Sequence, residues 1–331
     1  MSVHIALDAM SGDHGPSVTV PAALQALADN PMLRLTLVGD QPTIERLLSE
    51  PRDRLQIQHA TQVVEMDALP SSALRNKKDS SMRVSIDLVK SETVDACVSA
   101  GNTGALMATA KFVLKTLPGI DRPAILADLP AIGGSTLMLD LGANADCSVD
   151  QLVQFAVMGS VVASAVHGQL RPRVGLLNIG AEEMKGDEII REAGQRLQRS
   201  GLNYIGFVEG NDIFSDRVDV IVSDGFSGNV ALKTAEGLGK MIGQFLREEF
   251  SRNLVSKLAA AAAMPVLRRF RDRVDPRHHN GASLVGLRGI VIKSHGGADV
   301  VALTHAIRIA VLEVEKAVPK RIEALLEEQL R

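Results

Sequence analysis

VDACVSAGNTGAL at residues 94–106 returns in nearly the same form as VDVIVSDGFSGNVAL at residues 218–232. Both stretches follow the pattern V-D-x-x-V-S-x-G-x-x-G, in which a short apolar and β-branched run precedes two glycines. Such a run is typical of a buried strand, and the glycines permit the sharp turn that leads into a helix. The pattern therefore predicts an α/β fold in which two strand-to-helix junctions reached the same local solution.

Strand-like and helical patterns alternate along the rest of the chain. Short apolar runs predict strands at residues 3–10, 33–40, 54–60, 94–100, 135–142, 173–180, 202–210, 218–225 and 290–296. Longer patterns predict helices at residues 18–31, 41–50, 80–92, 105–117, 149–168 and 185–201, in a long region after residue 225, and over about the last thirty residues. This alternation favours a mostly parallel sheet with helices on both faces.

Composition narrows the classes of function. The 331 residues are 46% apolar and 23% charged, with a net charge of -3, which argues against a dedicated nucleic-acid binder. Eight Phe, one Tyr and no Trp leave little surface for stacking bases. Two cysteines indicate no disulfide framework and fit a reducing cytosol. The N-terminal MSVHIALDAM lacks signal-peptide features, and no uninterrupted apolar run reaches the length of a membrane span, so we expect a cytoplasmic protein, free or on a membrane surface.

Polar residues gather where the predicted strands end and helices begin, which is where sites form in parallel sheets. These residues are Asp8, Asp13, Asp40, Asn102, Thr103, Asp140, Asn144, Asn178, Lys185, Asp224, Asn229, Lys293 and His295. Each glycine turn has two interpretations. The free N–H groups of the following helix can bind an anion, or Asn102 or Thr103 can simply cap an ordinary helix.

Two further stretches place cations beside glycines. GLLNIGAEEMKGDE at residues 175–188 sets Lys185 before a helix whose first turn is acidic, which suits either a helix start or a cation over an anionic substrate. IKSHGGAD at residues 292–299 carries Lys293 and His295, a pair that suits charge stabilisation and proton transfer.

Motifs for other chemistries are missing. The chain has no G-x-x-x-x-G-K-[ST], no G-x-G-x-x-G after a strand and no G-x-S-x-G elbow. Cys97 falls within a predicted strand, nothing local makes Cys147 a nucleophile, and the eight histidines lack zinc-site spacing, so we expect no metal. A dehydrogenase is disfavoured because the dinucleotide fingerprint is absent, and a non-enzymatic acyl-chain carrier or membrane-binding protein would not need so many polar glycine turns.

Seven blocks together resemble the bacterial phosphate acyltransferase family, which moves an acyl group from acyl carrier protein to inorganic phosphate. They are ALDAMSGDHGP, SAGNTGALMA, RPAI, LDLGAN, VGLLNIGAEEMKG, SDGFSGNVALK and GASLVGLRGIVIKSHG, in this order from residue 6 to residue 296. One departure is Ser11, which stands where the family usually has glycine. The resemblance implies a three-layer α/β/α sandwich like isocitrate and isopropylmalate dehydrogenases, and a homodimer with its active site in a cleft.

The resemblance also implies an acyl phosphate product, which a membrane glycerol-3-phosphate acyltransferase then uses in phospholipid synthesis. No cofactor is expected beyond the phosphopantetheine that carries the acyl group on acyl carrier protein. Because phosphate is itself a nucleophile and a thioester is activated, the protein needs only to position the reactants and stabilise the oxyanion. We expect catalytic roles for Lys185, Asn229, His295 and Asp224. We expect substrate-binding roles for Asp8, Gly101, Asn102, Thr103, Gly104, Asp140, Asn144, Asn178, Gly228 and Lys293.

We expect residues 1–331 to form a single unit, which can divide into two lobes around a cleft. One segment of this unit suggests a second role. Residues 254–273, LVSKLAAAAAMPVLRRFRDR, are apolar up to an interruption at Pro265 and then carry four arginines: Arg268, Arg269, Arg271 and Arg273. They belong to an expected helical hairpin over residues 234–275. The segment can lie on the anionic inner face of the membrane, pack in a dimer interface, or dock acidic acyl carrier protein.

Overall fold

The computed structural model describes residues 2–48 and 53–329, and the side chains of all of these except 271–274, 276 and 329. The strands are β1 Val3–Asp8, β2 Leu33–Gly39, β3 Leu55–His59, β4 Ala96–Ser99, β5 Ala124–Ala131, β6 Gly134–Leu139, β7 Val174–Leu177, β8 Tyr204–Val208, β9 Val220–Val222, β10 Ala282–Val285 and β11 Ile290–Lys293. The helices are α1 Pro16–Asp29, α2 Gln41–Leu47, α3 Pro70–Asn76, α4 Ser81–Lys90, α5 Thr103–Leu114, α6 Val149–Val166, α7 Glu188–Gln198, α8 Gly225–Ser251, α9 Leu254–Val274, α10 Val300–Glu315 and α11 Val318–Gln329, with short 3-10 turns at Gly210–Phe214 and Pro276–His279.

The strands form one sheet in the order β3-β2-β1-β4-β11-β10-β5-β6-β9-β7-β8. β3, β2, β1, β4 and β11 run parallel to one another, as do β6, β9, β7 and β8. The pairs β11–β10, β10–β5 and β5–β6 are antiparallel and join these two parallel halves in the middle of the sheet. The predicted α/β fold with a mostly parallel sheet is confirmed.

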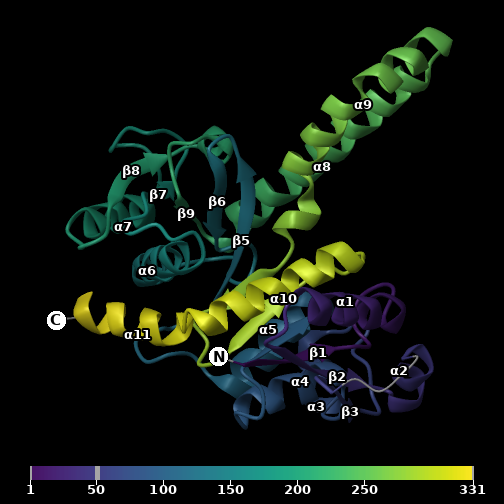
Figure 1. Cartoon of the computed structure of the whole chain (residues 1–331). Coiled ribbons are helices and arrows are strands. Elements are labelled where there is room, and N and C mark those ends of the chain that lie inside the picture. The colour runs from purple at the N-terminus through teal and green to yellow at the C-terminus, as the bar shows by residue number, and fades with distance from the viewer. Residues whose placement is uncertain (1, 49–52, 330–331) are drawn as a thin grey trace.

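Helices cover both faces of the first half of the sheet because its strands are apolar on both sides. On β1, Ile5 and Leu7 pack in a cluster with residues of α1 and α10, while Ala6 between them packs in a cluster with residues of α4 and α5. This arrangement places α1 and α10 side by side on one face (Figure 1). The carboxyl ends of β1, β4 and β11 are therefore held together by packing on both sides.

Three elements were not predicted from the sequence: α3, β5 and β10. The two strands are the antiparallel ones at the junction of the halves, where the repeating strand–helix pattern is interrupted. The predicted interruption at Pro265 is wrong, since α9 continues through this residue. A proline inside a helix removes one backbone hydrogen bond. Because Pro265 is exposed, water can donate a hydrogen bond to the carbonyl group that the proline leaves without its backbone partner.

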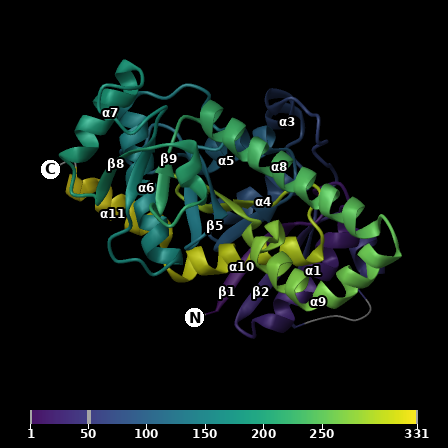
Figure 2. The ribbon, with the colours of Figure 1, turned by 90° about the horizontal axis from the view of Figure 1, so that it is seen from above.

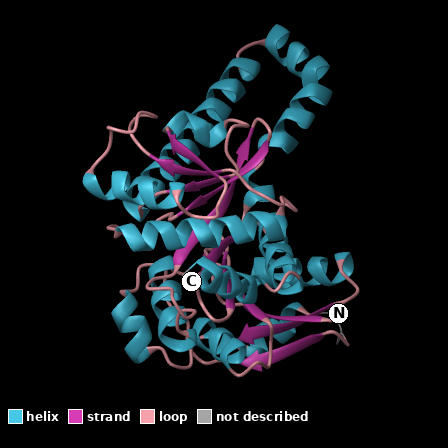
Figure 3. Cartoon of the chain, turned by 90° about the vertical axis from the view of Figure 1, so that its left-hand side faces the viewer, coloured by secondary structure: helices cyan, strands magenta, loops and turns pink. Residues whose placement is uncertain are grey.

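Two long helical regions differ in their surroundings. α6 is long and apolar enough to cross a membrane by length and composition alone, but most of it is buried against β6, β9, α7 and α11. It therefore belongs to the protein core, which explains its apolar character. α8 and α9 instead run back along each other and project from the sheet (Figures 1, 2 and 3). Several apolar side chains on them are exposed, including Leu238, Phe245, Leu258 and Val266.

Gly159 in the middle of α6 should be required for its packing on the sheet. A Cβ atom there would lie 2.5 Å from Val220 Cγ1 and 3.0 Å from Leu139 Cδ2. We expect Gly159→Ala to lower the free energy of unfolding by about 1–3 kcal/mol, as overpacked cores do. The matched control is Gly237→Ala in α8, where nothing lies within 4 Å of the new Cβ atom. That change should be neutral or stabilising by up to about 1 kcal/mol. Urea denaturation measures both, and equal effects would contradict the close packing.

Candidate active site

A buried polar cluster lies at the carboxyl ends of β1 and β4. Ser99 Oγ donates a hydrogen bond of 2.6 Å to Asp8 Oδ2. Ser11 Oγ donates to the Asp8 carbonyl oxygen at 2.7 Å and accepts from the Ala100 amide at 2.9 Å. Burial raises the pKa of Asp8, and the hydrogen bonds from serines and backbone oppose that rise. Ser11, the departure from the family pattern, thus ties the two strand ends together.

Lys293 at the end of β11 brings a cation to this cluster. Its Nζ donates to the carbonyl oxygens of Ala100, at 3.4 Å, and of Ser294. Burial lowers the pKa of Lys293 to about 8, while the negative charges of Asp13 and Asp8 oppose that shift. Because an ammonium group has three donors, Lys293 keeps one N–H beyond these two carbonyl contacts. It is therefore suited to hold an anion at neutral pH.

The first glycine turn leads from β4 into α5. Asn102 caps the helix, since its Oδ1 accepts from the Ala105 amide at 2.9 Å, and its Nδ2 donates to the Met66 and Ala68 carbonyl oxygens. The amide groups of Thr103 and Gly104 have no acceptor within residues 2–48 and 53–329. The capping interpretation of this turn is therefore confirmed, and anion binding at the turn stays a prediction. Asn102 is an N-cap, and two free N–H groups remain at the start of α5.

His295 follows Lys293 on an exposed loop. Its backbone N–H donates to Asn280 Oδ1 at 2.9 Å, which fixes the loop. Its ring Nδ1 lies 3.0 Å from the Gly297 amide and accepts from it, so the neutral ring carries its proton on Nε2. In its charged imidazolium form, with a proton on each ring nitrogen, the exposed His295 can donate its Nε2 proton to a leaving group.

The second glycine turn closes a buried network around Asp140. Asp140 Oδ1 accepts from the Ile125 and Ala143 amides, and Oδ2 accepts from the backbone and side-chain amides of Asn144. Burial raises the pKa of Asp140, and these hydrogen bonds oppose the rise. A Cβ atom on Gly228 would lie 2.0 Å from the Asp140 carbonyl oxygen, so only glycine fits against this loop.

The beginning of α8 presents the remaining residues of this turn. Asp224 caps α8, since its carboxylate accepts from the Ser227 amide and hydroxyl, both at 2.8 Å. Asn229 in the second turn is exposed and lies beside Gly142. Lys233 lies in the third turn of α8, about 12 Å from the start of the helix at 1.5 Å per residue. The charge of Lys233 lowers the pKa of Lys293 further, in addition to the effect of burial. α8 therefore connects the two halves of the site.

Asn178 and Lys185 lie together on the loop after β7. Asn178 Nδ2 donates to the Lys185 carbonyl oxygen at 3.1 Å, and its Oδ1 accepts from the Ile179 amide. Lys185 Nζ pairs with Glu182 Oε2 at 3.1 Å, with 46% of the lysine side chain exposed. The pair is thus open to solvent and free to exchange partners. Because β7 adjoins β9, this loop shares a sheet edge with the Asp224 turn.

Four of the residues that we expected to bind substrate are buried within the protein. Asp8, Asp140 and Asn144, which were expected to bind substrate, are buried and hydrogen-bonded within the protein, where they hold the surrounding loops. Their contact with substrate stays a prediction. Gly228 serves close packing in the same way. The two similar turns lie in different halves, since β11, β10, β5 and β6 separate β4 from β9.

Ser99 and Ser223 were missed by the sequence reasoning, although the repeated pattern contains them. They occupy the same position in V-D-x-x-V-S-x-G-x-x-G. Ser223 Oγ donates to the Asp140 carbonyl oxygen at 3.3 Å, much as Ser99 Oγ donates to Asp8. In both halves the serine thus binds the aspartate that ends or follows the neighbouring strand.

Other kinds of site find less support in the described part of the chain. Cys97 and Cys147 are buried, and burial raises the pKa of both thiols, that of Cys147 to about 12, so neither is prepared as a thiolate nucleophile. No group of three or more His, Cys, Asp or Glu side chains gathers to hold a metal ion among the described residues.

Comparison with known proteins gives a family and a fold. The profile of a family described as "Fatty acid synthesis protein" matches residues 3–321. A phosphate acyltransferase of Nitrosococcus oceani is 61% identical, covering 99% of this chain and 97% of the relative. Another, of Legionella pneumophila, is 54% identical over 96% of this chain and 94% of the relative. A phosphotransacetylase structure from Streptococcus pyogenes has a TM-score of 0.64 and 17% identity, covering 95% of this chain and 94% of that one, which shows a shared fold.

The charge of Lys293 predicts a pH dependence of anion binding. Since burial lowers its pKa to about 8, the cation is present below that pH and is lost as the pH rises through it. We expect the KM for phosphate to rise about tenfold per pH unit above this value, because each pH unit lowers the charged fraction of Lys293 about tenfold. In Lys293→Arg the charge persists, and KM should stay nearly flat to pH 9.5. Steady-state kinetics would refute the role of Lys293 if the wild-type KM were flat over the same range.

Proposed function

Because the chain belongs to the fatty acid synthesis protein family, and relatives that match it over nearly their full length are named phosphate acyltransferases, we propose that it transfers a fatty acyl group to inorganic phosphate. The chain is an acyltransferase that takes the acyl group from the thioester of acyl carrier protein. Its product, an acyl phosphate, serves phospholipid synthesis. The observation that supports this chemistry best is the buried cation Lys293 at the end of β11, next to β4, which leads into the free N–H groups of α5. The buried thiols of Cys97 and Cys147 are not prepared as nucleophiles.

The proposed mechanism is direct attack by phosphate on the thioester carbonyl carbon. Lys293 and the free amide groups of Thr103 and Gly104 hold the phosphate, which needs cationic and N–H donors. Gly101 allows the backbone to turn into this position. The tetrahedral oxyanion then collapses and the C–S bond breaks. The charged imidazolium form of His295 gives its Nε2 proton to the departing thiolate and is left as the neutral ring. No cofactor is required beyond the phosphopantetheine of acyl carrier protein.

Residues from the second half of the sheet complete the proposed cleft. Asn229 is exposed at the start of α8 and offers an amide donor to the oxyanion, and Asp224 orients that turn as its cap. Lys185, with Asn178 holding its loop, supplies a second cation for the phosphate once it leaves Glu182. Closing the two halves onto each other would bring these groups to the Lys293 side.

The finer architecture forms part of the same proposal. The chain is one unit of three layers, α/β/α, resembling isocitrate and isopropylmalate dehydrogenases, with two lobes around the cleft. It acts as a homodimer in the cytoplasm.

We propose that α8 and α9 form a protruding hairpin that rests peripherally on the inner face of the membrane, where a membrane glycerol-3-phosphate acyltransferase receives the product. The exposed apolar Leu254, Val255, Leu258 and Val266, together with the basic Arg268 and Arg269, support a membrane role. The side chains of Arg271 and Arg273 lie outside the described residues.

The proposed reaction predicts a trappable product. Purified protein mixed with acyl-acyl carrier protein and phosphate should yield acyl hydroxamate when hydroxylamine is added. Omitting phosphate is the control, because hydroxylamine also attacks thioesters slowly. Failure to find phosphate-dependent hydroxamate at any acyl length would reject the function.

The same assay separates the role of His295 from a structural one. His295→Ala should lower turnover by about 10²–10⁴-fold, as removal of a general acid does. With an aryl thioester, whose thiolate leaves without a proton, the loss should shrink to a few-fold. An equal loss on both donors would show that His295 does not protonate the leaving group.

Membrane contact by the α8–α9 hairpin is tested by liposome flotation. Leu258→Glu with Val266→Glu changes two side chains that are 64% and 59% exposed, so the fold should persist. We expect binding to anionic vesicles to be lost in this variant. Met32→Glu, at a position 51% exposed in the other half of the sheet, is the matched control and should float as the wild type does. Flotation of both variants would exclude the hairpin from membrane contact.

A further inference from the structure

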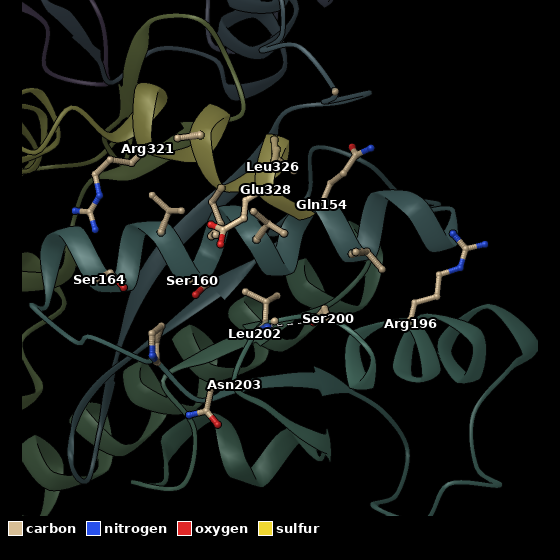
Figure 4. A pocket seen from close by; sticks show the side chains of 18 of the residues that line it. Gln154, Ser160, Ser164, Arg196, Ser200, Leu202, Asn203, Arg321, Leu326 and Glu328 are labelled. Carbon is tan, nitrogen blue, oxygen red and sulfur yellow. Dashed lines mark hydrogen bonds between the residues drawn. The ribbon is translucent and has the colours of Figure 1, made fainter. Parts of the chain in front are cut away.

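A large open cavity lies near the amino ends of β7 and β8 in the second half of the sheet. Its volume is about 1180 Å³, and it is lined by α6, α11 and the loop from α7 to β8 (Figure 4). Leu202 and Asn203 in its wall directly precede β8, so the cavity faces the amino ends of the strands. None of the residues proposed for acyl transfer lines this cavity, and Asp224 and Lys185 in the same half of the sheet follow the carboxyl ends of β9 and β7. The cavity therefore belongs to a separate surface.

One part of the cavity wall is apolar. Val153 on α6, Leu202 before β8 and Leu325 on α11 are partly exposed in this wall, and Leu170 is 96% exposed. Val157 and Val161, one and two turns farther along α6, lie beneath them in the hydrophobic core. An alkyl chain can lie against this apolar part of the wall, which a small polar metabolite would not need.

The rim of the cavity carries unpaired cations. Arg196 is occupied by Asp150 at 2.5 Å and Glu192 at 2.7 Å. Arg171, Arg199 and Arg321, in contrast, form no ion pair with any carboxylate among the described side chains. Figure 4 shows Arg321 on α11 and Arg196 on α7 at different sides of the opening. Arginine presents several donors in a fixed plane, which suits phosphate and carboxylate groups.

We propose that this cavity binds an anionic amphiphile, a single alkyl chain with one phosphate or carboxylate head group. The chain lies against Val153, Leu170, Leu202 and Leu325, and the head group meets Arg199 and Arg321 at the rim. An acyl phosphate, a lysophospholipid and a fatty acid share this chemistry. The site is independent of the proposed acyl transfer and requires none of its residues.

Calorimetric titration of the full chain with dodecyl phosphate, below its micelle concentration, tests the site. We expect saturable binding that Arg199→Ala with Arg321→Ala weakens at least tenfold. The matched control is Arg308→Ala on α10, whose side chain is 65% exposed and lies 3.8 Å from Asp29, far from the cavity in the fold. It should bind as the wild type does. Laurate in place of dodecyl phosphate tells whether the site prefers carboxylate or phosphate.

Two further measurements distinguish this cavity from other binding modes. Ser164→Phe, a change on the cavity side of α6, should block the chain and abolish binding while turnover is retained. Lys293→Ala, which removes the cation of the candidate active site, should leave binding unchanged. The proposal is overturned if the double arginine variant binds normally, if Lys293→Ala abolishes binding, or if uncharged dodecanol binds as tightly as dodecyl phosphate.

Discussion

The hydrogen bond from Ser99 to the buried carboxylate of Asp8, with its counterpart from Ser223 to the Asp140 loop, is the constraint on which the site depends. A buried carboxylate is costly unless donors surround it. Here the donors come from the neighbouring strand or from the following loop, so each strand end is tied to the next. The two glycine turns and the starts of α5 and α8 are thereby held in place before any substrate arrives.

Lys293 depends on the same network. Its ammonium lies among carbonyl oxygens and near Asp8 and Asp13, which preserve its charge against burial. A cation held in this way loses little solvation when it meets phosphate, because it has already lost its water. His295 lies two residues farther along on an exposed loop, where its free ring nitrogen can reach a bulky thioester. In the proposed mechanism, the buried Lys293 holds the phosphate, and the exposed His295 protonates the leaving thiolate.

The two proposed anion-binding surfaces share no residue. Backbone N–H groups and lysines that follow the carboxyl ends of their strands suit a small phosphate. Arginines and partly exposed apolar residues near the amino ends of β7 and β8 suit a long amphiphile. α6 joins the two, because Gly159 packs on Leu139, the residue before Asp140. Its apolar composition, which resembles a membrane span, follows from burial between the sheet and α11.

The sequence alone determined the alternation of strands and helices, the parallel character of the sheet and the family, because local periodicity and motif order carry that information. It also placed Asn102, Thr103, Asp224 and Lys293 at strand ends. It could not find β5 and β10, whose partners are distant in the chain, nor decide between a capping residue and a ligand. Only the tertiary structure showed that Asp8, Asp140 and Asn144 are buried positioning groups, since burial depends on what packs above a loop. The repeated V-D-x-x-V-S-x-G-x-x-G was visible as a motif, but its serines acquired meaning only when the folded sheet placed an aspartate beside each one.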